Sequence, residues 1–171
     1  VESIRRRIRR AAERSGRDPE CISIVAVTKN VEIDSIREAV RAGVSILGEN
    51  RVQEAKAKAA AVGTEVGGEK VSWHLVGHLQ RNKARPALEI FSLIHSLDSW
   101  RLACELERVA ERLDVVQECL LQINVSREST KYGVDPDDAV DLGRQIAGLE
   151  RIKLAGIMAI APVVETADEA R

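Results

Sequence analysis

Aromatic side chains are scarce in this 171-residue sequence, which has two tryptophans, one tyrosine and one phenylalanine. Surfaces that stack on nucleic-acid bases need several aromatic rings, so this scarcity argues against such a partner. Neither sign of charge is in excess, because 26 Lys and Arg residues are balanced by 27 Asp and Glu residues. A balanced surface has no global field that would attract nucleic acid or a membrane, and we predict neither as a partner.

Long apolar runs are also missing. None approaches the roughly 20 residues of a membrane-spanning helix, and the basic segment "VESIRRRIRR" lacks the apolar centre of a signal peptide. Cysteine occurs at three positions without C-x-x-C spacing, Cys21, Cys104 and Cys119. This pattern is typical of reduced, mostly buried thiols and not of a zinc site. We therefore expect a soluble, cytoplasmic protein without a metal centre.

The sequence does contain a regular alternation of short apolar runs and longer helical patterns after a basic amphipathic segment, Ser3–Arg14. The runs predict strands at Ile22–Thr28, Val44–Gly48, Val71–Gly77, Phe91–Ser96, Glu118–Val125 and Leu154–Ala161. The longer patterns predict helices at Ile33–Ala42, Asn50–Val62, Asn82–Leu88, Ser99–Leu113 and Pro136–Leu149. A glycine-rich segment, Gly63–Lys70, is expected to be an exposed loop. Repeated strand–helix–strand units predict an α/β fold with a parallel sheet.

The turn after the first expected strand contains no glycine. An open dinucleotide-binding sheet usually has a glycine-rich turn there, whereas this sequence reads "TKNVEI". We therefore favour a TIM-type (β/α) barrel. A complete barrel of this type has eight strands and typically about 250 residues, so the sequence predicts a barrel that lacks its last two strands. Residues 1–171 are expected to form one C-terminally incomplete domain.

Lys29 follows the apolar strand residues in the stretch "ISIVAVTKN", and it is the first candidate for chemistry. Active sites of (β/α) barrels lie where strands end and the following loops begin. An amine there can form a Schiff base with an aldehyde, and a surrounding apolar strand would favour its neutral, nucleophilic form. The alternative is a lysine at a strand end that extends its ammonium into water, and position alone favours that alternative.

Other polar residues follow the next strands. Asn50 and Gln53 form a capping-box pattern, so Asn50 is expected to be the N-cap of a helix, and its amide can also face a ligand. His74 and His78 are expected to share one face of a strand, but no third metal ligand lies nearby.

Three further candidates come later in the chain. Asn124 interrupts an apolar run and needs partners if it is buried. Lys131 could be a second amine near the site, although exposure in a loop is the default expectation. Met158 in the last expected strand is more often core filler than a ligand contact.

The order of these segments resembles the pyridoxal phosphate homeostasis proteins, whose barrel is similar to the N-terminal domain of alanine racemase. The matching segments span the whole chain: "VAVTKN", "GENRVQEA", "WHLVGHLQRNKAR", "IHSLDS", "QINVSRESTKYG" and "LAGIMAIAP". The resemblance implies that Lys29 holds pyridoxal 5′-phosphate (PLP) as an internal aldimine. It also implies that Asn50 and Met158 border this cofactor, with His74 nearby.

The resemblance implies a protein that buffers PLP and delivers it to PLP-requiring apoenzymes in vitamin B6 homeostasis. The alternatives are an amino-acid racemase or decarboxylase on the same barrel, and a structural or partner-binding barrel with no cofactor. Members of the family continue to a Ser-Met-Gly-Met-Ser and an Arg-Ile-Gly-Thr segment that bind the cofactor phosphate, and both segments are absent from this sequence. We therefore expect a chain with the aldehyde-binding half of the site.

Overall fold

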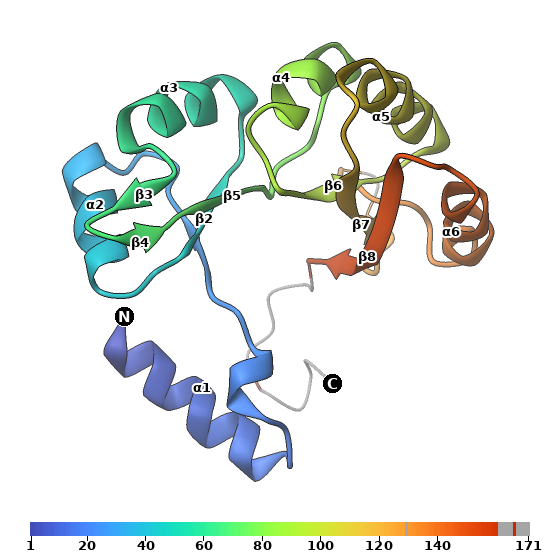
Figure 1. The fold of residues 1–171 in the computed structure, drawn as a ribbon. Coiled ribbons are helices and arrows are strands. Elements are labelled where there is room, and N and C mark those ends of the chain that lie inside the picture. The colour runs from blue at the N-terminus through green and yellow to red at the C-terminus, as the bar shows by residue number, and fades with distance from the viewer. Residues whose placement is uncertain (129, 161–165, 167–171) are drawn as a thin grey trace. The chain divides into compact units, whose positions relative to one another are not determined.

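The computed structural model describes residues 1–128, 130–160 and 166. The chain forms two compact units, Val1–His74 and a second unit that begins at Leu75. Figure 1 labels helices and strands of both units. Each unit has its own strands and helices, and they are described separately below. No helix in the described part of the chain is both long and apolar enough to cross a membrane.

The first unit contains the parallel strand pair that leads to Lys29. Its elements are α1 (Glu2–Arg14), η1 (Pro19–Cys21), β1 (Val25–Val27), α2 (Ile33–Arg41), β2 (Ile46–Glu49), α3 (Val52–Val62), β3 (Glu65–Val66), β4 (Glu69–Lys70) and β5 (Ser72–Leu75), which ends at the unit boundary. Neighbouring strands follow the order β1-β2-β5, and β1 pairs in parallel with β2. The core includes Leu47 and Ala55, which are completely buried.

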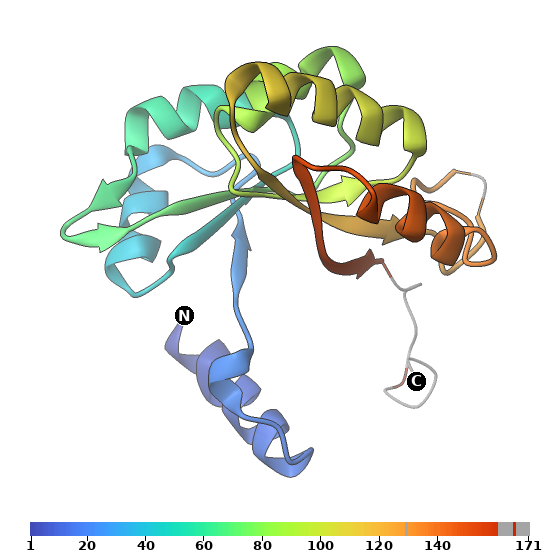
Figure 2. The same ribbon diagram turned by 45° about the vertical axis from the view of Figure 1, so that its right-hand side comes forward.

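The second unit is a parallel sheet with helices α5 and α6 packed against it (Figure 2). Its elements are η2 (Arg81–Lys83), α4 (Ala84–Leu88), β6 (Leu93–Leu97), α5 (Trp100–Leu113), β7 (Gln117–Ile123), α6 (Ala139–Ala147) and β8 (Ile152–Ala159). Strand β7 lies between β6 and β8 and is parallel to both. These two helices have apolar stripes at helical spacing, and the stripes face the interior. Leu106 of α5 and Ile146 of α6, which belong to them, are completely buried.

The α/β class with parallel strands, predicted from the sequence, is confirmed. Two local expectations are wrong. The first strand is shorter than expected and is not buried on both faces, since Val27 is 47% exposed. The glycine-rich segment forms the antiparallel pair β3–β4 instead of a loop. Gly67 and Gly68 both have positive φ angles, the conformation that a two-residue hairpin turn requires.

The cysteines also differ from expectation. Cys119 on β7 is buried as predicted, and burial raises the pKa of its thiol to about 12. Cys21 and Cys104 are exposed. Cys104 lies on α5 outside the buried stripe that contains Leu102 and Leu106. A small apolar side chain on a surface helix therefore gave a misleading indication of burial.

Gly133 holds the loop after β7 close to the strand. The amide of Val134 donates to the carbonyl of Gln122 at 2.8 Å, and the amide of Asn124 donates to the carbonyl of Val134 at 2.9 Å. Gly133 has φ +126°, and a Cβ there would lie 2.6 Å from the backbone nitrogen of Asn124. Only a residue without a side chain fits this approach.

We expect the Gly133→Ala variant to be destabilised by roughly 1–3 kcal/mol, because the added methyl group must displace backbone. The matched control is Gly143→Ala in α6, where the nearest atom to an added Cβ is 3.9 Å away. Alanine in a helix is preferred over glycine by about 1 kcal/mol, so this control should be at least as stable as the parent. Urea unfolding measures both variants, and equal midpoints for the two would contradict this account of Gly133.

Candidate functional site

Lys29 lies in a tight turn directly after β1. The carbonyl of Thr28 accepts a hydrogen bond from the amide of Val31 at 3.0 Å, which closes the four-residue turn. Asn30, its third residue, has φ +58°. Asparagine tolerates this left-handed conformation better than most side chains, which explains the sequence "TKN". Lys29 is exposed, and its amine has no hydrogen bond or ion pair among the described residues.

The exposure of Lys29 differs from the apolar surrounding that its strand predicted. Burial around it begins only at Thr28, which is 4% exposed. Its amine is therefore accessible to a ligand without any rearrangement of the core.

Beneath the turn lies a buried polar network that links β1, β2 and α3. Glu49, the last residue of β2, is completely buried. Its Oε1 accepts a hydrogen bond from Thr28 Oγ1 at 2.6 Å and one from Lys58 Nζ at 2.7 Å. Lys58 Nζ also donates to the backbone carbonyl of Thr28. The second carboxylate oxygen, Oε2, has no hydrogen-bond partner among the described residues.

Lys58 reaches this network because it lies on the inward face of α3. The buried residues of the helix are Val52, Ala55 and Val62. Position 58 follows Ala55 by three residues and precedes Val62 by four, so it falls on the same stripe. Its side chain is 14% exposed and Glu49 is fully enclosed, which makes the pair a buried salt bridge.

Asn50 lies two residues beyond Gly48, as Lys29 lies two residues beyond Val27, and Val27 and Gly48 are register partners. The two residues therefore come to the same end of the β1–β2 pair. The expectation that Asn50 caps α3 is wrong, because the N-cap is Arg51. The half-buried side chain of Asn50 makes no hydrogen bond among the described residues, so its amide can form hydrogen bonds with a ligand.

The histidines do not share a strand face as the sequence predicted, because β5 ends at Leu75. His74 is half-buried on β5 in the first unit. His78 lies beyond that strand, with Nδ1 3.3 Å from Asp98 Oδ2. Its ring stacks on Tyr132 with centroids 3.9 Å apart. His95 on β6 is half-buried, and desolvation lowers the pKa of its imidazole.

The candidates in the second unit are already engaged or packed. Lys131 pairs with Glu128 at 2.6 Å, and the side-chain amide of Asn124 donates to the carbonyl of Glu128 at 2.9 Å. Met158 is half-buried on β8, in register with Gln122 of β7. The proximity of Met158 and His74 to Lys29 stays a prediction.

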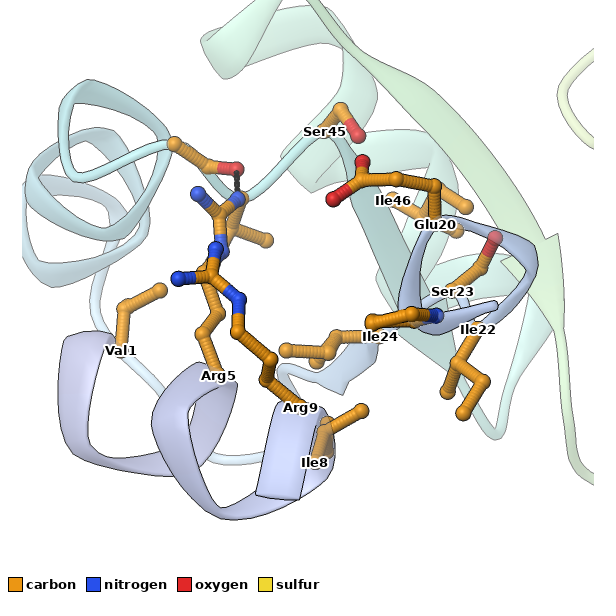
Figure 3. Close-up of a pocket in the computed structure, with 13 residues that line it drawn as sticks. Val1, Arg5, Ile8, Arg9, Glu20, Ile22, Ser23, Ile24, Ser45 and Ile46 are labelled. Atoms are coloured by element: carbon orange, nitrogen blue, oxygen red, sulfur yellow. Dashed lines mark hydrogen bonds between the residues drawn. The ribbon is translucent and has the colours of Figure 1, made fainter. Parts of the chain in front are cut away.

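Figure 3 shows a cavity of about 290 Å³ in the first unit, and Lys29 is not among the residues that line it. It is formed by α1 and by residues at the start of β1 and β2, including Ile24 and Ile46. Arg5 extends across it and donates to the carbonyl of Gly43. The cavity is therefore at the amino ends of these strands, opposite the end that carries Lys29 and Asn50.

Comparison with known proteins gives one family. The model of the alanine racemase N-terminal domain matches residues 1–171. The pyridoxal phosphate homeostasis protein of Aquifex aeolicus is 36% identical over 165 residues, which are 96% of this chain and 71% of the relative. The protein of the same name from Pseudomonas aeruginosa is 38% identical over 98% of this chain and 71% of the relative. The chain belongs to the pyridoxal phosphate homeostasis protein family.

Solved structures support the assignment of this chain to the family. PipY of Synechococcus elongatus with PLP bound is 40% identical over 95% of this chain and 74% of the relative, with a TM-score of 0.79. A protein from Bifidobacterium adolescentis is 34% identical over 96% of this chain and 69% of that one, with a TM-score of 0.88. Alanine racemase of Clostridium difficile is 16% identical with a TM-score of 0.64, a likeness in fold alone. The alanine-racemase-like α/β fold predicted from the sequence is thus confirmed.

Sequence reasoning missed the roles of Thr28, Glu49 and Lys58. A signal was present, since an acidic residue that continues an apolar strand needs a buried partner. The helical spacing that places Lys58 on the stripe of α3 supplies that partner.

The buried pair predicts a distinct pattern of stabilities. Lys58→Met leaves an uncompensated buried carboxylate, which should cost about 3–5 kcal/mol of unfolding free energy. The double variant Glu49→Gln/Lys58→Met buries no charge and should recover most of that loss, because removing both charges of such a pair is often close to neutral. Chemical denaturation measures this. A double variant no more stable than Lys58→Met would contradict the account.

Proposed function

We propose that this family member binds pyridoxal 5′-phosphate and that its role is to buffer the cofactor and deliver it to PLP-requiring apoenzymes in vitamin B6 homeostasis. The observation that carries the proposal is the 40% identity, over 95% of the chain, to a PipY structure with PLP bound. The names of the curated relatives support the homeostasis role. Cytoplasmic localisation is part of the same proposal.

The residues of the first unit fit this cofactor. Lys29 offers an exposed amine without a partner in the described structure, at the carboxyl end of a strand. We propose that it holds the cofactor aldehyde as a Schiff base and that Asn50 borders it, with Met158 and His74 completing the surroundings. When bound, PLP supplies a reactive aldehyde and an electron-withdrawing ring.

We further propose that the protein is a carrier and not an amino-acid racemase or decarboxylase. Racemisation needs an acid–base group on each face of the substrate α-carbon. Lys29 can serve one face. Burial keeps the Cys119 thiol protonated at neutral pH, and Tyr132 is stacked on His78. Cys21 precedes β1, at the strand end opposite Lys29.

The first test maps the attachment site. Borohydride reduction of the protein with PLP, followed by peptide mapping, should place the pyridoxyl label on Lys29. The Lys29→Ala variant should lose it, whereas Lys131→Ala should keep it because that amine is paired with Glu128. A label found mainly on Lys131 or Lys83 would overturn the assignment of Lys29.

The second test separates carrier from enzyme. With PLP bound, the protein should show no multiple-turnover exchange of the α-proton of L-alanine, or of a panel of other amino acids, in deuterated water. The physical reason is that a second positioned acid–base group is required for enzymatic rates. Multiple turnovers that disappear in Lys29→Ala would establish the racemase alternative.

A further inference from the structure

Lys58 bonds directly to the peptide group that precedes Lys29. Its Nζ donates to the carbonyl of Thr28, and the nitrogen of that same peptide group is the backbone nitrogen of Lys29. A charged donor makes a stronger hydrogen bond than a neutral one. The Lys58 ammonium on α3 therefore bonds to the Thr28–Lys29 peptide group, in the backbone that carries the proposed cofactor lysine.

Thr28 is held at each of its polar atoms. Its amide donates to the carbonyl of Gly48 at 2.9 Å, and its hydroxyl donates to Glu49 at 2.6 Å. Its carbonyl accepts from Val31 at 3.0 Å as well as from Lys58. An exposed turn has few such constraints of its own, and here they come from the buried side. The backbone from which Lys29 projects is therefore fixed by strand β2 and helix α3 together.

Packing alone does not explain this arrangement. Glu49 is completely buried and its Oε2 has no partner among the described residues. Apolar residues of similar volume often fill the place of a buried ion pair without loss of stability. A pair that includes an unsatisfied carboxylate oxygen at the end of β2, and that bonds to the peptide of Lys29, is better explained by what it positions.

We propose that Lys58 and Glu49 are positioning residues that fix the direction in which the Lys29 amine leaves the turn. The proposal rests on the proposed attachment of PLP to Lys29. In that attachment the Lys29 nitrogen bonds to the aldehyde carbon, and the aldehyde oxygen leaves as water with the two amine protons. A lysine whose backbone is already fixed reacts faster, because the turn does not have to be ordered first.

The experiment compares labelling rates in the full chain. Wild type and Glu49→Gln/Lys58→Met are incubated with PLP and cyanoborohydride, and the pyridoxyl label on each lysine is followed in time by peptide mapping. The exposed Lys70 and Lys153 serve as internal references. We expect labelling of Lys29 to slow roughly tenfold relative to the references. Lys58→Arg keeps a donor for both acceptors and should restore most of the rate.

A second readout separates positioning from structural damage. Pyridoxine 5′-phosphate lacks the aldehyde and cannot bond to Lys29, so its affinity should be the same in wild type and double variant. An equal loss of this affinity, or a collapsed thermal transition, would overturn the positioning role in favour of a structural one. Unchanged labelling of Lys29 in the double variant would also overturn it while leaving the proposed function intact. Absence of Lys29 label in the wild type would instead overturn the proposed function.

Discussion

The parallel register of β1 with β2 is the constraint on which the candidate site depends. Val27 lies opposite Gly48, so the chain leaves both strands at the same end. Thr28 then bonds to Glu49, and Lys29 and Asn50 follow at that end of the pair. In an antiparallel pair the residues after β1 would lie beside those that precede β2. Lys29, Glu49 and Asn50 lie at the same end of this strand pair because the strands run in one direction.

Helix α3 fixes the backbone at this end of the strand pair through Lys58. It begins at Val52, after two residues that separate it from β2, and places Lys58 between one and two turns along its axis. Side chains of a helix tilt toward its N-terminus, so Lys58 extends back toward the strand ends and reaches both Glu49 and Thr28. The same residue therefore neutralises a buried carboxylate and attaches a helix to the turn after β1. Packing of α3 and geometry of the turn are coupled through one side chain.

Much of the fold could be predicted from the sequence, because the spacing of apolar residues indicates which segments are helices or strands and which of their faces are buried. The prediction of helices α2, α3 and α5 succeeded for this reason. It was less successful where turns interrupt the spacing of apolar residues. A buried strand was expected up to Thr28, but β1 ends at Val27 and leaves that residue half exposed. The hairpin at Gly67 and Gly68 was missed because paired strands of two residues carry too little pattern.

The position of the candidate site could be predicted from the sequence, but its hydrogen bonds and its buried ion pair could not. Lys29 and Asn50 follow strand ends, a feature that the alternation of elements gives directly. The partners of Glu49 depend on which face of α3 meets the sheet and on the register of β1, and these are tertiary facts. Read singly, "GEN" offered a helix cap at Asn50, whereas the structure places the cap at Arg51 and assigns the neighbouring glutamate to the core.

An exposed amine above a buried hydrogen-bond network suits the proposed carrier role. Enzymes that use such cofactors close their sites against water, which protects reactive species and strengthens electrostatic interactions. A protein that gives up its cofactor needs water at the linkage, because hydrolysis returns the free aldehyde and the free lysine. If Lys29 holds the cofactor as proposed, its exposure would admit that water, and the network beneath it would keep the backbone of the turn unchanged after each release. Rigid backbone and accessible side chain are thus compatible in one turn, because the hydrogen bonds that fix the turn lie on its inner side.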